Sequence, residues 1–528
     1  MKQSNDGFLK YQWKSKELVT ILNLKNTILK TETLKNRDIK ALKICALSII
    51  FALGLTPNLS ATDLRIGTAT ADITPSLPVA LQGQGHLRIA KTVETTLAAS
   101  VLAIESLDGN RSLDAAIMVS CDVTYLPREL IKMVCDEVHK QIPELDQRKI
   151  ILNATHTHTA PVLENYYYQI PKTGVLQIDQ YRAFFVQRVT EAISKAWKTR
   201  RPGSVTWGLS HAVVGYNRRP VYNDGKAQMY GNTNTPGFLN IEAMEDHDVN
   251  VLFFWDKGGK LIATSINVSC PAQEAENRYT VNADYWYPVR EQLKKRFGKD
   301  LCVLGWTSAA GDISTRRNYA MAAEERMIRL RKLTQLEDMG RRIVAAVGEA
   351  FEAVKNERYT NIQLIHKVEK LSLPMRLVTE GEYLYCKGEM EKAEAQIAAD
   401  PQAAEKVLSV VKWNGNVVNR YEKQKTNRNP ELETEIHVIR LGEVAICTNE
   451  FELYTDYGVR IQARSNALQT FTIQLAGPGG SYLATENATS HGSYGAIIQS
   501  CTVTPEGGQI LVEHTIRLIN DMFIKTKN

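Results

Sequence analysis

The sequence predicts a single large mixed α/β domain, and three observations predict it. Short apolar runs alternate with longer amphipathic segments along most of the chain. Of 528 residues, 44% are hydrophobic and 23% are charged, which is ordinary for a folded protein and enough for one large core or two moderate ones. No internal repeat, low-complexity tract or linker rich in proline and glycine divides the chain after about residue 63. We therefore expect one domain over residues 63–528.

The order of the expected elements supports this class. Strands are expected at 65–73, 101–106, 115–123, 149–154, 204–214, 249–255, 261–268, 301–306, 437–441, 444–448 and 470–476. Helices are expected at 127–141, 181–199, 284–297, 324–355, 381–411 and 509–522. The polar stretch 373–433 is expected to be a helical insertion that either covers a site as a lid or is a solvated surface excursion.

The first 62 residues are predicted to be an export signal and the basic segment before it. Lys40 and Lys43 precede the apolar run 44–55, ICALSIIFALGL, and small residues follow it. This order is typical of a signal peptide, with cleavage near Ala61, and the run is too short to span a bilayer comfortably. An internal hydrophobic helix is the alternative. We therefore expect a periplasmic or secreted protein.

Cysteine content and net charge bear on two questions: whether all thiols can pair and whether the protein binds nucleic acid. Removal of the signal takes Cys45 and leaves seven cysteines, an odd number without a CxxC pair, so at least one thiol should be unpaired. The net charge of +6 is modest for this length, and no basic patch indicates nucleic acid. The sequence implies no protein partner.

A histidine pair at the end of a predicted strand is the first candidate site. In the run ILNATHTHTAP at 151–161, His156 and His158 lie where an apolar strand gives way to a loop. Residues two apart on extended backbone project to the same side, so the two imidazoles could share one pocket. Imidazole binds zinc, and a second imidazole could move a proton. The pair could equally be a polar strand end.

Other polar side chains also follow predicted strands, directly or nearly so. They are Cys270, Ser314, Glu450 and Tyr482. Such positions gather functional groups in α/β proteins. With His156, these residue types supply enough nitrogen, sulfur and oxygen donors for a four-ligand divalent site.

Five segments together resemble the neutral (alkaline, non-lysosomal) ceramidases. They are GTATADITP at 67–75, ATHTHTAP at 154–161, GDIS at 311–314, NEF at 449–451 and SYLAT at 481–485. The blocks occur in the family's order, and the resemblance covers most of the chain from about 65 to 523. It implies the catalytic domain of that family, without the C-terminal immunoglobulin-like domain.

The resemblance also implies roles for single residues. It makes His156, Glu450 and Tyr482 zinc ligands and places His158 beside the metal, where it helps proton transfer or holds the oxyanion. Arg218, in YNRR at 216–219, would bind the amide oxygen of the substrate or the carboxylate product. Ser314 would be the nucleophile or part of the substrate pocket.

The sequence departs from the family pattern in three places. The second zinc histidine of the family falls on Cys270, in VSCPAQ at 268–273. A thiolate can replace imidazole on zinc, so Cys270 is either the fourth ligand or a small buried residue. A GIHxRxxxR block is missing at 92–96, and Ser314 is not followed by Pro-Asn.

We therefore expect a zinc-dependent hydrolase that cleaves an N-acyl amide bond with a metal-activated water. The leading substrate is a ceramide-like sphingolipid, which could bring the protein to a membrane surface. The tyrosine-rich runs 166–168 and 285–287 could line an apolar groove, although tyrosines also suit a polar amide. Three alternatives stay open: a non-lipid amide or ester as substrate, Cys270 as nucleophile with a histidine base, and a catalytically silent exported binding protein.

Overall fold

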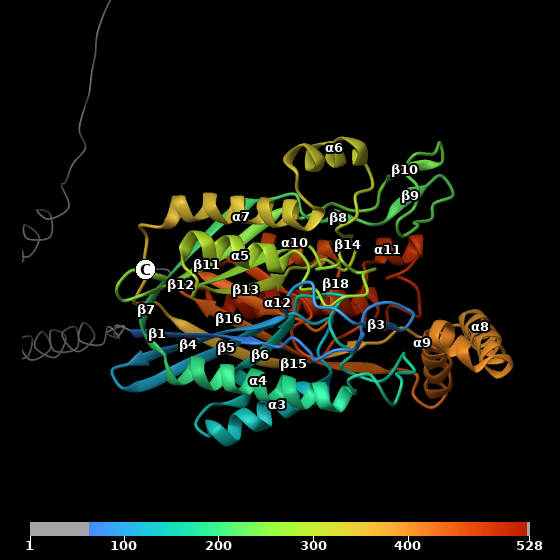
Figure 1. Cartoon of the computed structure of the whole chain (residues 1–528), viewed down its shortest axis with the longest axis horizontal. Helices are drawn as coiled ribbons and strands as arrows, with labels where there is room; N and C mark the ends of the chain where they lie inside the picture. Colours follow the sequence, from blue (N-terminus) through green and yellow to red (C-terminus); the bar gives the residue numbers. More distant parts are fainter. Residues whose placement is uncertain (1–62, 525–528) are drawn as a thin grey trace, which may run out of the picture. The chain divides into compact units, whose positions relative to one another are not determined.

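Two β-sheets packed face to face, with helices on the outer face of each, form the protein (Figure 1). The computed structural model describes residues 63–524, which belong to one compact unit. The predicted export signal and its cleavage point lie outside the described residues. The mixed α/β class predicted from the sequence is confirmed.

The larger sheet has eight strands and mixes parallel with antiparallel pairs. In sheet order they are β13 (Cys302–Thr307), β12 (Leu261–Val268), β11 (Asp248–Asp256), β7 (Arg201–His211), β1 (Asp63–Asp72), β4 (Ala98–Asp108), β5 (Arg111–Cys121) and β6 (Ile150–Ala154). The pairs β5–β6 and β12–β13 are parallel, and the other pairs are antiparallel. The sheet therefore ends in a parallel pair at each edge.

The smaller sheet packs on the inner face of the larger one. Its strands, in sheet order, are β15 (Leu364–Pro374), β16 (Glu431–Leu441), β17 (Val444–Thr448) and β19 (Gln469–Ile473). Leu102 and Ile104 of β4 join Ile439 and Ile446 in the cluster between the sheets. Val101, one position away, faces the opposite layer. Because both faces of β4 are buried, its central run Val101–Ile104 is apolar on both faces and does not alternate.

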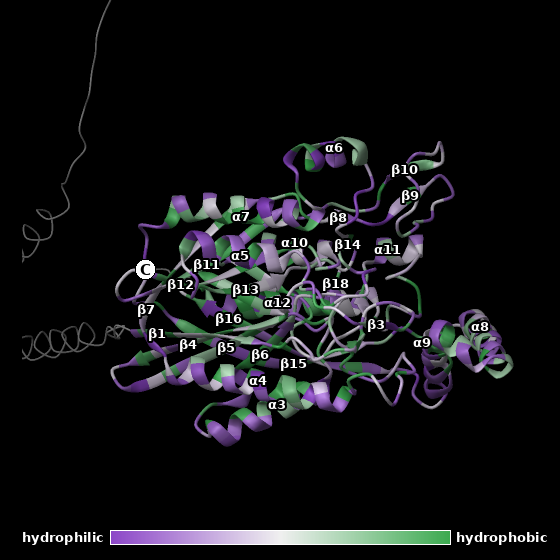
Figure 2. Ribbon diagram, viewed as in Figure 1, coloured by the Kyte–Doolittle hydropathy of each residue, from purple (hydrophilic) through white to green (hydrophobic). Residues whose placement is uncertain are grey.

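Helices cover the outer faces of both sheets. One half of the larger sheet is covered by α3 (Arg128–Gln141) and α4 (Ile178–Lys198). The other half is covered by α5 (Trp286–Phe297) and α7 (Gln335–Val354). The smaller sheet is covered by α10 (Thr455–Arg464) and α12 (Pro505–Met522). Hydrophobic and hydrophilic residues alternate along the ribbons of α4 and α7 (Figure 2). This is the pattern of helices with one buried face.

Two predicted helices are each divided in the structure. The expected helix 324–355 is α6 (Met321–Arg331) followed by α7, because Lys332 has a left-handed φ of 57° and Thr334 starts a new helix with a capping box to Glu337. The expected helix 381–411 is α8 (Glu380–Ala399) followed by α9 (Ala404–Gln424). Pro401 interrupts it, since proline cannot continue a helix from within.

The hairpin of α8 and α9 is the predicted insertion. It joins two neighbouring antiparallel strands, since Pro374 at the end of β15 pairs with Glu431 at the start of β16. Figure 1 shows α8 and α9 projecting beyond the sheets. The other elements are short: β2 (Val79–Leu81), β3 (Arg88–Ala90), β8 (Tyr216–Asn217), β9 (Pro220–Tyr222), β10 (Phe238–Ile241), β14 (Ile313–Ser314), β18 (Glu452–Leu453), β20 (Tyr482–Leu483), α11 (Glu486–His491) and the 3₁₀ turns Gln147–Lys149 and Pro401–Ala403.

The carboxyl ends of several strands meet at one edge of the two sheets. The Ala154 amide at the end of β6 donates to the Leu475 carbonyl after β19, and the Gly477 amide donates to the Leu152 carbonyl. The Ala272 amide after β12 donates to the Thr155 carbonyl after β6. Segments far apart in the sequence therefore converge here, as the α/β class predicts. No helix between residues 63 and 524 has the length and apolar character to cross a membrane.

Candidate active site

A cavity of about 520 Å³ lies at this edge. That volume is within the usual range of small-molecule sites, about 300–1,000 Å³. Five polar residues from four separate segments line it and form its reactive centre: His156, His158, Arg218, Glu452 and Tyr482. The remaining walls come from the loop 82–85, from Met229 and Tyr230, and from helix α9.

The two predicted histidines meet, although their backbone is not extended. His156 has a left-handed φ of 66°, a conformation in which histidine is several-fold enriched, and its amide donates to the Val123 carbonyl at 3.0 Å. The imidazole Nε2 atoms of His156 and His158 nevertheless lie 3.3 Å apart. The expectation of an extended segment was wrong, whereas the shared pocket is present.

The His156 ring is held so that one nitrogen faces the cavity. Its Nδ1 donates to the Thr124 carbonyl at 2.6 Å, which leaves Nε2 with a lone pair in the neutral ring. The Glu452 carboxylate lies 3.4 Å from that Nε2. A lone pair and a carboxylate repel each other unless a cation lies between them. Burial lowers the pKa of His156, but the Glu452 carboxylate and the Thr124 carbonyl outweigh burial and raise it above its ordinary value.

His158 lines the cavity and has close neighbours at both ring nitrogens. Its Nδ1 lies 3.5 Å from the Glu276 carboxylate, and the Gln273 side-chain nitrogen lies 2.8 Å from its Nε2. Gly83 packs on the ring so closely that a Cβ there would lie 2.4 Å from Cγ, and its φ of 108° also favours glycine. Burial lowers the pKa of His158, and Glu276 offsets this in part. The ring is therefore neutral and oriented by a carboxylate.

A buried arginine holds the surroundings of His158 together. Arg88 is 1% exposed and donates to the carbonyls of Gln82, His158, Glu276 and Arg278 at 2.5–2.9 Å. It thereby joins the glycine loop, the histidine segment and the loop that carries Glu276. Hydrogen bonds from a charged donor are stronger than neutral ones, so this linkage is rigid.

Two short parallel strands place Glu452 and Tyr482. Glu452 of β18 pairs in register with Tyr482 of β20, and both side chains line the cavity. The Arg218 guanidinium lies 5.3 Å from the Tyr482 ring and donates to the Gly311 carbonyl at 2.8 Å. Burial by itself would raise the pKa of Glu452. His156, Arg218 and Tyr482 lower this pKa by more than burial raises it, so the carboxyl group is ionised.

Solved structures share this architecture. The structure of neutral ceramidase from Pseudomonas aeruginosa superposes with a TM-score of 0.61 at 15% identity, covering 88% of this chain and 76% of that chain. A structure of ceramidase complexed with C2 superposes with a TM-score of 0.62, also at 15% identity, over 88% and 77%. This chain has the neutral-ceramidase fold. No protein-family model and no curated protein matches the sequence.

Within the neutral-ceramidase fold of this chain, the carboxylate of the centre is Glu452 and not Glu450. The backbone bends at 450 and 451 between β17 and β18, so Glu450 leaves the cavity. Its carboxylate lies 3.8 Å from Arg128, and burial raises its pKa to about 7. Glu450 is thus a buried structural carboxyl group. Glu452 also follows a predicted strand closely, so a signal for it was present in the sequence.

Cys270 does not reach the reactive centre either. It is fully buried in the apolar cluster beneath α5 and α7, and it does not line the cavity. Burial raises the pKa of its thiol far above the ordinary value, which disfavours the thiolate needed for a ligand or a nucleophile. The second interpretation of Cys270, a small buried residue, describes its position. All seven cysteines in residues 63–524 are unpaired.

Ser314 lies behind the cavity wall and supports Arg218 indirectly. It is 1% exposed, its hydroxyl accepts from the Arg316 amide, and its strand β14 pairs with β8. The neighbouring Asp312 accepts from the Arg218 amide through its carbonyl. The GDIS block therefore positions the arginine, and Ser314 is not placed to attack a substrate.

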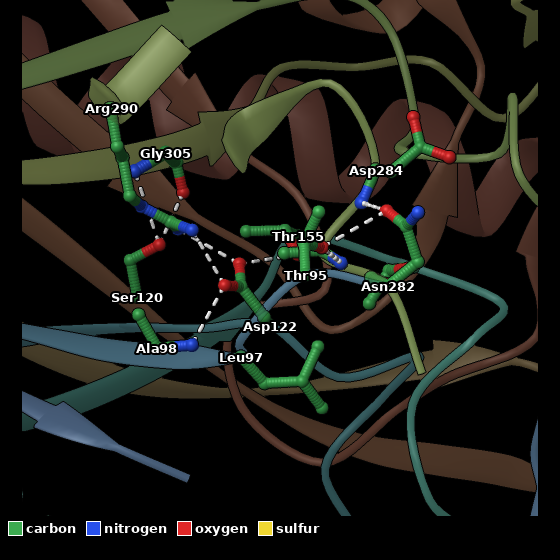
Figure 3. A network of polar contacts seen from close by, with 12 residues as sticks. Thr95, Leu97, Ala98, Ser120, Asp122, Thr155, Asn282, Asp284, Arg290 and Gly305 are labelled. Atoms are coloured by element: carbon green, nitrogen blue, oxygen red, sulfur yellow. Dashed lines mark hydrogen bonds and ion pairs between the residues drawn. The ribbon is translucent and has the colours of Figure 1, made fainter. Parts of the chain in front are cut away.

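A buried ion pair fixes the strand ends next to His156 (Figure 3). The Asp122 carboxylate accepts from both terminal nitrogens of Arg290, at 2.6 and 2.8 Å. It also accepts from the Ala98 amide and the Thr155 hydroxyl. Thr155 directly precedes His156, so the ion pair restrains the backbone of the histidine segment.

Of the aromatic runs, only one contributes to the cavity. Tyr167 and Tyr168 line it, whereas Tyr285 and Trp286 are buried beneath α7. Gln273, Glu276 and Arg88 were missed, because no local pattern marks a lone polar residue that meets its partner through tertiary contacts. In residues 63–524, no three His, Cys, Asp or Glu side chains are grouped so that they alone could hold a metal ion.

Proposed function

We propose that the protein hydrolyses the N-acyl amide bond of a ceramide-like substrate. The observation that carries this proposal is the convergence of His156, His158, Glu452, Arg218 and Tyr482 in one cavity of a neutral-ceramidase fold. Together these groups supply a proton carrier, a carboxylate and a fixed cation. Those are the parts that amide hydrolysis requires.

We further propose that the centre holds zinc. The space between His156 Nε2 and Glu452 requires a cation, and a metal ion can replace the proton there. Donors of a tetrahedral zinc site lie roughly 3.3 Å apart, as bonds of about 2.0–2.1 Å dictate. The distance from His156 Nε2 to the Glu452 carboxylate is 3.4 Å. His156, Glu452 and the Tyr482 phenol would be the ligands, and bound zinc lowers the pKa of water and polarises a carbonyl.

The residues of the chain then have separate tasks. Arg218, buried and always charged, holds the amide oxygen as negative charge develops on it, a contribution of about 3 kcal/mol in comparable sites. His158, neutral and oriented by Glu276, moves a proton from the attacking water to the leaving nitrogen. The in-register pairing of β18 with β20 holds Glu452 and Tyr482 beside each other near His156.

Metal content and turnover test the proposal together. We expect purified protein to contain about one zinc ion per chain by elemental analysis, and we expect the variant His156→Ala to lose it. We expect chelation to abolish hydrolysis of N-acyl sphingosine and added zinc to restore it. Full activity after exhaustive chelation contradicts the zinc proposal, because the water would then need no metal.

A panel of substrates separates the alternatives. Hydrolysis of polar N-acyl amides or esters without hydrolysis of N-acyl sphingosine would favour the non-lipid substrate. Bound zinc without any turnover would favour an exported binding protein. Alkylation of Cys270 is expected to leave activity unchanged, since its thiol lies outside the cavity.

A further inference from the structure

A span of three residues, 282–284, lies behind the reactive centre; we call it the anchor span. It follows the loop that carries Glu276 and ends shortly before α5. Asn282 and Asp284 are 0% and 1% exposed, and their side chains lie outside the cavity, so neither can touch a substrate. Their hydrogen bonds reach the residues next to His158 and the residue before Glu276 (Figure 3). The span therefore contacts both segments that supply this pair.

Asn282 fixes the segment that carries the histidine. Its carbonyl accepts from the hydroxyls of Thr157 and Thr159, at 2.8 and 2.7 Å. These two threonines flank His158 in the sequence, and both are 0% exposed. The Asn282 amide also donates to the Thr159 carbonyl at 3.3 Å. One residue of the anchor span therefore holds the chain on both sides of the His158 imidazole.

Asp284 fixes the segment that carries the glutamate. One oxygen of its carboxyl group accepts from the Ala275 amide at 2.6 Å, and the other accepts from the Tyr285 amide at 2.8 Å. Ala275 directly precedes Glu276, whose carboxylate lies 3.5 Å from His158 Nδ1. Asp284 has a left-handed φ of 54°, a conformation in which aspartate is several-fold enriched. Its carboxyl group thus ties the Glu276 loop to the start of α5.

The partners of Asp284 set it apart from two other buried aspartates. Asp122 and Asp338 bind arginines, whereas Asp284 accepts from two backbone amides. Burial of a carboxyl group is costly, and at this position backbone hydrogen bonds offset that cost. An amide side chain could accept only one of the two bonds, because its nitrogen is a donor. The position therefore requires a carboxyl group, which indicates that the backbone geometry around it must be kept.

A hydroxyl group from the segment 92–96 holds the anchor span in place. The Thr95 hydroxyl donates to the Asn282 side-chain oxygen at 3.2 Å and accepts from the Ala283 amide at 2.8 Å. The Thr95 amide donates to the Val281 carbonyl at 3.3 Å. This is the segment at which the GIHxRxxxR block is missing from the sequence. In this chain the segment supports the anchor span from outside the cavity.

We infer that Asn282 and Asp284 are positioning residues, which set the distance and direction of Glu276 relative to His158. The inference rests on the proposed amide hydrolysis, in which His158 carries a proton to the leaving nitrogen. Glu276 orients the His158 ring for this transfer. A displacement of about 1 Å in such a geometry can lower the rate by about 100-fold. Because neither positioning residue touches the substrate, the effect of Asp284 passes through Glu276.

A cycle of single and double variants tests this route. We expect Asp284→Asn to lower kcat for N-acyl sphingosine by about 10–100-fold, with KM within about threefold and an unchanged zinc content. In the Glu276→Gln protein, we expect Asp284→Asn to lower kcat by less than about twofold further, because residues that act through one group are not additive. Losses that multiply in the double variant overturn the inference. As a control, Asp338→Asn alters an equally buried carboxyl group on α7 and should leave kcat within about twofold.

Two variants of Thr95 provide the same test if Asp284→Asn does not fold. Thr95→Val keeps the shape of the side chain but removes its hydroxyl group, and we expect it to lower kcat by about threefold to tenfold. Thr95→Ser keeps the hydroxyl group and should retain the wild-type kcat. Equal losses in the two variants overturn the inference, because the hydroxyl group would then not be the cause.

Hydrogen exchange followed by mass spectrometry tests the anchor span without requiring turnover. We expect Thr95→Val to speed exchange of the backbone amides in both segments, 156–160 and 274–278, because the span holds both. Faster exchange in one segment alone overturns the inference. Absence of turnover in the wild-type protein contradicts the proposed function, and the exchange result then decides by itself whether the span couples the two segments.

Discussion

The protein contains two buried histidine pairs that look alike but differ in their surroundings. His156 and His158 have nitrogens 3.3 Å apart and ring centroids 4.8 Å apart; for His366 and His437, between the sheets, the values are 3.0 and 5.2 Å. The first pair opens into a cavity, whereas the second does not line it. Distance between imidazoles therefore does not distinguish an active site from a structural contact.

The neighbouring groups make the difference. His156 faces the Glu452 carboxylate, which raises its pKa despite burial. His366 Nδ1 donates to the Ala115 carbonyl, near the Lys149 ammonium, and burial lowers the pKa of His366 to about 3. One pair attracts a cation and the other excludes a proton. A carboxylate, that of Glu435, also lies 3.6 Å from His437 Nε2, so the cavity and the buried Glu452 carboxylate are what distinguish the first pair.

The largest expected effect comes from removing one imidazole from each pair. We expect His156→Ala to lower kcat/KM for N-acyl sphingosine by about 10²–10⁴-fold, because it removes a group of the reactive centre. We expect His366→Ala to leave kcat/KM within about threefold and to lower the free energy of unfolding by about 1–3 kcal/mol, because His437 loses a buried partner. Equal loss of activity in both variants would remove the distinction between the pairs.

The next effect separates the two neighbouring glutamates. We expect Glu452→Gln to lower kcat by about 100-fold, because the amide lacks the charge that a cation at His156 requires. We expect Glu450→Gln to change kcat by less than about threefold, because its carboxyl lies beside Arg128. Steady-state kinetics of both variants, with metal content measured in parallel, decide the assignment. A greater loss in Glu450→Gln would restore the assignment made from the sequence.

The smallest effect is the pH dependence of stability that the structural pair produces. Burial, with His366 as a second cause for His437, lowers the pKa of each to about 3 from 6.5. Below about pH 6.5 the unfolded chain therefore binds protons that the folded protein excludes. The free energy of unfolding should fall as pH falls through this window, by about 1.4 kcal/mol per pH unit for each proton.

Urea unfolding at several pH values measures this slope. The charged groups around the pair are Lys149, Asp114, Asp146 and Glu435, and they remain in every variant. The double variant His366→Leu, His437→Leu should show a shallower slope, because two titrating groups are gone. An unchanged slope would mean that other groups cause the acid sensitivity.

The sequence alone identified the architecture and the first half of the site. Short apolar runs in the sequence predicted strands. The end of the strand before residue 155 marked both histidines. Tyr482 and Arg218 could be placed because each lies in a short block with a recognisable neighbourhood. These features are local, since a few adjacent residues determine them.

Only the tertiary structure decided which other side chains join the histidines. Glu450 and Glu452 are equivalent in the sequence, and the bend before β18 together with its pairing to β20 sends Glu452 alone to the cavity. Glu276 reaches His158 because Arg88 binds backbone carbonyls of three segments. Cys270 is buried in the apolar core beneath α5. The physical reason is that such contacts depend on backbone direction over long sequence separations, which periodicity and spacing do not encode.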